Sequence, residues 1–273
     1  MQAATANSGE ISQVYDSYFD VIRADAPALL DRVYQIRYQV YCVENPFEDP
    51  MQNIGEREVD AHDERAAHLL LVHRKTGVAA GTARVIFPDT SSRRPLPIER
   101  IIDSDGRRLF RRLPWQTTGE VSRFAISKAF RQRHGEDRYA DTGWGTTSQS
   151  GLAERRAMPF ITFGLMRGII GICLERDITH LTAVMEPPLI RLLKRFGLDF
   201  QPVGGLVEYH GVRQPCAAGV YDLIESARSK GGPLWLYYKE EIVRRGGPAL
   251  SHTRTPRARD ANKIHPPSLA AAD

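Results

Sequence analysis

The stretch TTGEVSRFAI, residues 117–126, decides how the rest of the chain is interpreted. It has the pattern of a strand, yet it carries two charged residues, Glu120 and Arg123. A buried carboxylate and a buried guanidinium are tolerated only when paired and hydrogen-bonded, so this pair predicts a structural lock or part of a site. Residues three apart in a regular strand face opposite sides, so the two side chains can meet only across a bulge or through other partners. A bulge would also leave backbone N–H groups free for a ligand.

Length and composition predict a soluble globular chain. Its 273 residues are enough to bury the core of one large domain, and the 42% hydrophobic and 26% charged fractions are ordinary. No apolar run is long enough to span a membrane, and residues 1–10 lack the basic start and apolar core of a signal peptide. Three scattered cysteines without Cys-x-x-Cys spacing predict free thiols in a reducing compartment. We therefore expect a cytoplasmic protein.

The net charge of +4 invites a nucleic-acid interpretation, which its distribution weakens. The last 24 residues carry four basic and two acidic side chains, so half of the net charge lies in this tail. The net charge of the rest of the chain is too small to indicate a DNA-binding surface. The chain divides into a flexible N-terminus (1–10), a single domain (11–245) and a disordered basic tail (246–273).

Residues 11–41 have apolar residues at helical spacing and predict two helices, the second starting near Pro27. Arg37 stands among the apolar positions of this second helix, which predicts an acidic partner elsewhere. A β-hairpin follows, with strands at 68–72 and 78–86 around a Lys75-Thr76-Gly77 turn.

A dense set of carboxylates, Glu58, Asp60 and Asp63, leads into this hairpin. One interpretation is a solvated loop, and the sharper one is an acidic cluster that faces Arg37, Arg84 and Arg123. A metal site built from Asp60 and Asp63 with two histidines, His62 and His68, is the weakest alternative, because the spacing matches no established ligand set. We predict no metal.

The second half alternates helices and strands. A basic helix ends the 88–114 connection, and a polar loop is expected at 131–156. A long apolar helix at 159–176 and a strand at 178–185 follow, and then a helix at 189–196 that ends at Gly197. The last expected elements are a strand at 198–203, a turn at 209–211 and a strand or helix start at 217–224. Apolar residues of the long helix either line an acyl tunnel or belong to the core: Phe160, Phe163, Leu165 and Met166. The order predicts a mixed α/β sheet flanked by helices.

In this context the motifs resemble the Gcn5-related N-acetyltransferase fold, and within it the acyl-homoserine-lactone (autoinducer) synthases. The resemblance spans roughly residues 30–126 and rests on a series of motifs that occur in the family's order: Arg37 with Tyr41 and Phe47; Glu58, Asp60 and Asp63 as Glu-x-Asp-x-x-Asp; Arg84; and Glu120, Arg123 and Phe124 as Glu-x-x-Arg-Phe. Over the whole chain, RYQVYCVE (37–44) and HGVRQPC (210–216) more closely resemble acyltransferases associated with PEP-CTERM/exosortase systems.

The resemblance implies a cytoplasmic N-acyltransferase that moves a long acyl chain from acyl carrier protein or acyl-CoA to a small-molecule amine, without a tightly bound cofactor. The family's pyrophosphate loop begins at Gln132 but is broken by Glu136 and Asp137, which favours an acidic carrier protein as donor, met by the basic stretch 107–112. N-acyl amino acid synthases share the fold and are an alternative, as is a non-catalytic acyl-ligand or carrier-protein binding module.

The expected site has a catalytic and a substrate-binding part. A carboxylate, Glu58 or Glu120, takes the proton of the amine, and backbone N–H groups near residues 123–126 hold the oxyanion. The predicted catalytic residues are Glu58, Glu120 and Arg123, and the predicted substrate-binding residues are Arg37, Tyr41, Phe47, Asp60, Asp63, Arg84, Phe124, Ala125 and Ile126.

Overall fold

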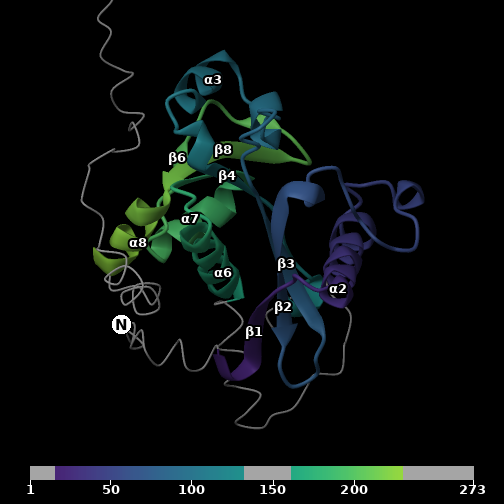
Figure 1. The fold of residues 1–273 in the computed structure, drawn as a ribbon. Coiled ribbons are helices and arrows are strands. Elements are labelled where there is room, and N and C mark those ends of the chain that lie inside the picture. Colours follow the sequence, from purple (N-terminus) through teal and green to yellow (C-terminus); the bar gives the residue numbers. More distant parts are fainter. Residues whose placement is uncertain (1–15, 132–160, 230–273) are drawn as a thin grey trace, which may run out of the picture.

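A computed structural model describes residues 16–131 and 161–229 of the chain. An eight-stranded sheet runs through this part in the order β1-β2-β3-β4-β5-β8-β6, with β7 beside β8 (Figure 1). Of the neighbouring pairs only β4 and β5 are parallel. The strands are β1 (Phe19–Arg23), β2 (Ala66–His73), β3 (Ala79–Ile86), β4 (Thr118–Ile126), β5 (His180–Met185), β6 (Gln201–Pro202), β7 (Val207–Glu208) and β8 (Val212–Gly219). The predicted mixed α/β sheet is confirmed.

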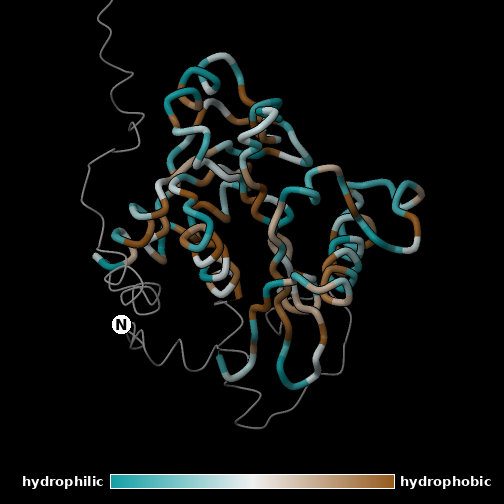
Figure 2. Tube along the Cα trace, in the orientation of Figure 1, coloured by the Kyte–Doolittle hydropathy of each residue, from teal (hydrophilic) through white to brown (hydrophobic). Residues whose placement is uncertain are grey.

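Helices cover both faces of the sheet. They are α2 (Pro27–Tyr38), continued by a π-helix (Gln39–Glu44), then α3 (Ser104–Phe110), α4 (Lys128–Arg131), α6 (Ile161–Glu175), α7 (Pro187–Arg195) and α8 (Val220–Ser229). The α6 side holds the largest core, where Leu69, Leu71 and Val85 meet α6, α7 and α8. On the other face α2 packs on Leu70 and Val72, and the 96–113 segment packs on Ile86. Figure 2 shows the apolar residues concentrated on the central strands and on α6.

The first predicted helix is wrong over residues 19–23, which form the edge strand β1. Its apolar residues fit helical spacing, but β1 pairs with β2 in antiparallel register, from Phe19 opposite His73 to Arg23 opposite Leu69. This tertiary pairing outweighs the local pattern. The second helix is confirmed, with Pro27 in its first turn.

The second half of the chain largely follows the prediction. The hairpin, the long apolar helix, β5 and α7 are confirmed, and Gly197 ends α7 with φ of +84°. The strand predicted at 198–203 shrinks to Gln201–Pro202. The segment 217–224 is both a strand end and a helix start, since β8 stops at Gly219 and α8 begins at Val220. The loop predicted at 131–156, apart from Arg131, and the boundaries at residues 10 and 245 lie outside the described residues.

Strand β4 has two irregularities. Its pairing with β3 shifts between Thr82 and Arg84, which shows that β4 has a bulge, and Arg123 has a left-handed φ of +48°. Its parallel pairing with β5 ends at Val121 opposite Ala183, although β4 continues to Ile126. Beyond residue 121, therefore, the edge of β4 that faces β5 has no strand partner within the described part of the chain.

The three cysteines, Cys42, Cys173 and Cys216, are buried free thiols. Within residues 16–131 and 161–229, no helix is long and apolar enough to cross a membrane.

Candidate active site

The predicted acidic cluster faces the three arginines, as expected. Arg37 of α2 is fully buried, and its Nε donates to Glu58 Oε2 at 2.6 Å. Its Nη1 donates to Asp63 Oδ1 at 2.7 Å. Position 37 lies on the buried side of α2, with Val33 and Ile36, where an unpaired guanidinium would be costly. These two carboxylates supply the acidic partner that the sequence predicts.

Arg84 of β3 is the second centre of the network. Its Nη1 donates to Asp60 Oδ1 at 2.6 Å and to Asp63 Oδ1 at 2.5 Å, and its Nε donates to Ser122 Oγ at 2.9 Å. Only 2% of its side chain is exposed. Asp63 therefore joins Arg37 to Arg84, which ties α2 to the sheet.

Arg123 completes the network from the bulge in β4. Its Nε and Nη2 donate to the two carboxylate oxygens of Glu58 at 3.0 and 2.8 Å, and Nη2 also donates to Glu48 Oε1 at 3.1 Å. Asp60 Oδ2 lies 3.3 Å from Nη2. In a regular strand residue 123 would face away from residue 122, so the left-handed backbone at the bulge brings its side chain to the acidic loop. Its side chain is 15% exposed, against 0% for Arg37 and 2% for Arg84.

Mutual pairing keeps these side chains charged. Burial by itself raises the pKa of Glu58, but hydrogen bonds from Arg123 and Arg37 outweigh burial and leave it below the usual value. The pKa values of Asp60 and Asp63 are lowered in the same way, against burial, by Arg84 and Arg37 respectively. Burial acts to lower the pKa of Arg123, and the hydrogen bond to Glu58 raises it on balance. Glu58 is therefore a weak base whose two oxygens are both engaged by arginines.

The predicted pairing of Glu120 with an arginine is wrong. The buried Glu120 carboxylate accepts a hydrogen bond from the backbone N–H of Ile98 at 2.9 Å, and no ion pair joins it to Arg123 in the described structure. Burial raises the pKa of Glu120 to about 8. The bulge turns Arg123 toward Glu58 of the acidic loop, and Glu120 lies one pleat beyond Ser122 under the 96–113 segment.

We expect Glu120→Gln to be more stable than the wild type at pH 8.5. In the folded wild type the pKa of Glu120 lies above the ordinary value of 4.5, so the native carboxyl binds its proton more tightly than the unfolded one does. Wild-type stability therefore declines as pH rises from about 4.5 to 8. The amide removes this loss, which amounts to roughly a few kcal/mol. Urea unfolding at pH 5.5 and 8.5 measures it, with the exposed Glu208→Gln as control. Equal pH dependence of wild type and Glu120→Gln would contradict the assignment.

An aromatic wall closes one side of the network. Arg123 lies 5.2 Å from the ring centre of Tyr41, and this ring is 6.4 Å from that of Phe47. Phe47 in turn contacts His210, in the turn between β7 and β8, at 5.2 Å, and Arg213 of β8 lies over its ring. Tyr41 and Phe47 were predicted from the sequence as site residues. His210 and Arg213 were not, because only the fold brings them next to Phe47.

The remaining predicted residues line β4 beyond the bulge. Ala125 is buried against α2, while Phe124 and Ile126 are half-buried. The sequence left open whether four apolar residues of the long helix line an acyl tunnel or belong to the core. Three of them, Phe163, Leu165 and Met166, are buried in the core around α6. The fourth, Phe160, lies outside the described residues.

Three further side chains of the network were missed. Glu48 and Ser122 carry no local signal, since their partners are 75 and 38 residues away in sequence. His68 was considered only as a metal ligand. Burial lowers its pKa to about 4, and its Nε2 lies 3.6 Å from Asp63 Oδ1. In residues 16–131 and 161–229, no three His, Cys, Asp or Glu side chains are placed to hold a metal ion.

Comparisons with known proteins agree with this architecture. Residues 36–140 match the family described as an acetyltransferase (GNAT) domain. TofI, in a ternary complex with an inhibitor and MTA, is similar with a TM-score of 0.53 at 17% identity, over 77% of this chain and 96% of TofI. BjaI, a CoA-dependent acyl-homoserine lactone synthase solved with MTA, gives 0.50 at 16% identity, over 85% of this chain and 90% of BjaI. FeeM, an N-acyl amino acid synthase, gives 0.49 at 15% identity, over 78% and 96%. No curated protein matches the chain by sequence.

The domain match and the structural likeness establish the Gcn5-related N-acetyltransferase fold, and together they indicate an acyltransferase. The predicted fold is thereby confirmed, with an autoinducer synthase among its structural neighbours. The association with PEP-CTERM/exosortase systems stays a prediction.

Proposed function

We propose that the protein is a cytoplasmic N-acyltransferase that moves a long acyl chain from acyl carrier protein or acyl-CoA to a small amine. The observation that carries the proposal is the parting of β4 from β5 beyond Val121, directly beside the bulge that bears Arg123. Unpaired strand edges present backbone N–H groups, which suit the oxyanion that forms when an amine attacks a thioester carbonyl. The ordered charges and aromatic rings beside this edge form the acceptor side of the site.

In the proposed reaction, the amine nitrogen bonds to the thioester carbon, the C–S bond breaks, and the donor thiol leaves with a proton. A carboxylate must take the proton from the amine. Glu120, with a pKa of about 8, is the stronger base of the two predicted carboxylates, and it acts through a water because it is buried. Glu58 holds Arg123 in place, since its two oxygens are occupied by that guanidinium and by Arg37.

Exposure assigns different roles to the arginines. Arg37 and Arg84 are closed off from substrate and maintain the fold of the site. Arg123, with 15% of its side chain exposed, is the one that a substrate reaches. If the acceptor carries a carboxylate, as in an N-acyl amino acid synthase, Arg123 is its partner.

The donor is best assigned by its charge. Arg107 and Arg108 of α3, with Arg111 and Arg112 just beyond it, are all exposed. Such a surface suits an acidic carrier protein. The broken pyrophosphate loop that begins at Gln132 lies outside the described residues, so the preference for a carrier protein over coenzyme A rests on this basic surface and on the sequence.

Mass spectrometry of lipid extracts from cells expressing the wild type or Glu120→Gln tests the proposal. We expect a new acylated amine with the wild type and at least about tenfold less of it with Glu120→Gln, in line with the usual contribution of a general base. The exposed Glu225→Gln of α8 is the matched control, and circular dichroism checks that all three proteins are folded. If purified wild type forms no acylated amine from either acyl carrier protein or acyl-CoA, the binding-module alternative replaces the proposal.

A further inference from the structure

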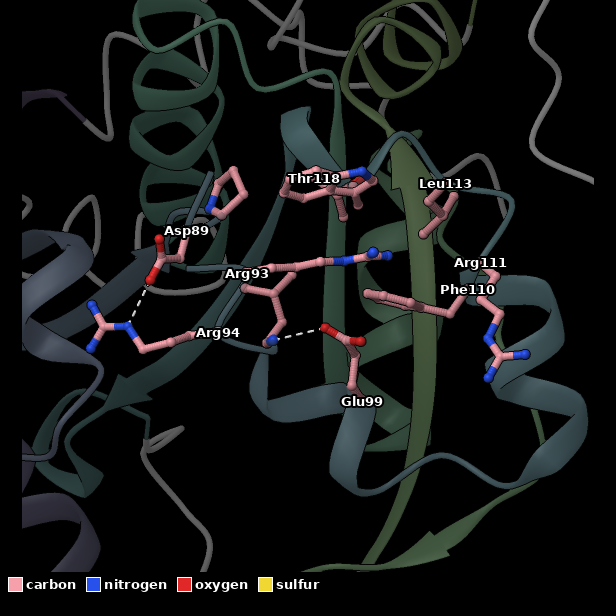
Figure 3. A pocket seen from close by; sticks show the side chains of 11 residues that line it. Asp89, Arg93, Arg94, Glu99, Phe110, Arg111, Leu113 and Thr118 are labelled. Atoms are coloured by element: carbon pink, nitrogen blue, oxygen red, sulfur yellow. Dashed lines mark hydrogen bonds and ion pairs between the residues drawn. The ribbon is translucent and has the colours of Figure 1, made fainter. Parts of the chain in front are cut away.

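A pocket lies at the opposite end of β4 from Arg123. It has a volume of about 550 Å³, and Thr118, the first residue of β4, belongs to its wall (Figure 3). Five residues of strand, about 17 Å, separate Thr118 from Arg123. This pocket is therefore separate from Arg123 and its network, although Glu120 follows Thr118 by only two residues in β4. Its size is that of a small-molecule site.

One half of the pocket is apolar and one guanidinium crosses it. Leu96, Phe110, Leu113 and Trp115 form the apolar wall. The Arg93 side chain extends across the middle of the pocket, and its guanidinium lies 5.0 Å from the ring centre of Trp115 (Figure 3). Stacking of this kind leaves the N–H groups at the edge of the guanidinium available to an acceptor.

The loop before α3 is built so that Arg93 takes this position. The Asp89 carboxylate accepts hydrogen bonds from the backbone N–H groups of Ser91 and Ser92 at 3.1 and 2.9 Å and from Arg94 Nε at 2.7 Å. Arg93 itself has a left-handed φ of +51°, which costs free energy in a residue with a side chain. Asp89 thus organises the loop and neutralises Arg94, which points away from the pocket.

The charges of the pocket favour an anion, because three arginines, Arg93, Arg94 and Arg111, stand against two carboxylates, Asp89 and Glu99, in its lining. Glu99 keeps its charge, and its Oε1 accepts the backbone N–H of Leu96 at 2.9 Å. Arg111 contributes to the wall, but its guanidinium points outward (Figure 3). In the described part of the chain, Arg93 has no carboxylate partner, and its one contact partner is the Trp115 ring. A guanidinium with free N–H groups beside aromatic and aliphatic walls recognises a carboxylate carried on an apolar body.

We propose that this pocket binds a small carboxylic acid with an aromatic or alkyl body, with the carboxylate on Arg93 and the body against Trp115, Phe110 and Leu113. The proposal concerns binding alone, and no reaction of the ligand is proposed. The proposal is independent of the acyltransferase activity, and its test needs no turnover.

Binding is measured on full-length protein with ¹⁵N-labelled tryptophan. The chain has three tryptophans, and Trp115→Phe identifies the indole N–H signal of Trp115. Three probes separate charge from body: indole-3-acetate carries both, indole-3-acetamide only the body, and acetate only the charge. We expect indole-3-acetate to shift the Trp115 signal with an affinity about tenfold or more above either control, the usual value of a charge-assisted hydrogen bond. Octanoate tests the alkyl body in the same way.

Arg93→Gln should remove the advantage of indole-3-acetate over its amide, while Arg191→Gln, the same change on exposed α7, should keep it. The retained Trp115 signal reports that each variant is folded. The proposal is overturned if neither acid moves that signal in wild-type protein up to about 10 mM, the range of very weak binding. It is overturned equally if Arg93→Gln binds indole-3-acetate as the wild type does.

Discussion

Glu58→Gln is expected to lower the free energy of unfolding by about 3–5 kcal/mol, the usual cost of removing one partner from a buried ion pair. Glu58 accepts hydrogen bonds from Arg37 and Arg123, and both Glu58 and Arg37 are buried. The amide keeps the shape but loses the charge, so a buried guanidinium is left under-compensated. Urea unfolding at pH 7 measures the loss.

The matched control for this prediction is Glu56→Gln, two residues away on the exposed side of the same loop. We expect it to remain within about 0.5 kcal/mol of the wild type, as is usual for surface substitutions. A Glu58→Gln protein as stable as Glu56→Gln would mean that Arg37 and Arg123 do not depend on this carboxylate. In that case the network would have to be held by Asp60 and Asp63 alone.

The second large effect is expected in acid. Glu58, Asp60 and Asp63 have folded pKa values below their ordinary values of 4.5, 3.8 and 3.8. Their contribution to stability is fully present above the unfolded values and is lost as pH falls through the folded ones. Each carboxylate that takes up a proton only on unfolding contributes about 1.4 kcal/mol per pH unit, so three together give a slope of about 4 kcal/mol per pH unit.

Urea unfolding between pH 5.5 and 3 measures this slope. Because Glu120 has the opposite sign, with stability declining as pH rises toward 8, we expect maximal stability near pH 5. In Glu120→Gln the decline above that maximum should become shallower while the acid limb is unchanged. Constant stability from pH 5.5 to 3 would show that these carboxylates are not ionised partners in the native protein.

Much of the fold follows from local signals. Pro27 at the start of α2, the Lys75-Thr76-Gly77 turn and Gly197 at the end of α7 act through their own backbone preferences, so their positions are readable without a structure. Strand β1 is not readable in this way. Its residues have helical spacing, and its strand conformation depends on the free edge of β2, nearly fifty residues later.

The candidate site, too, was predictable only where local sequence signals decide the structure. Charged residues at apolar positions identify Arg37, Arg84 and Arg123 as network members, because burial demands partners. The identity of each partner was only partly predictable. Glu58 instead of Glu120 pairs with Arg123 because a left-handed residue at the bulge redirects the guanidinium, and a strand pattern contains no sign of that backbone angle. His210 reaches Phe47 only once β7 and β8 are in place.

The long sequence separation within the network has a consequence for biosynthesis. Chains emerge from the ribosome N-terminus first, at roughly 5–20 residues per second, so the acidic loop is made several seconds before Arg123. During that interval Glu48, Glu58, Asp60 and Asp63 have only Arg37 and Arg84 to neutralise them, and the nascent segment carries excess negative charge. Closure of the network therefore waits for β4, and closure of its aromatic wall waits for the turn at His210. The aromatic wall is therefore completed later than the charge network.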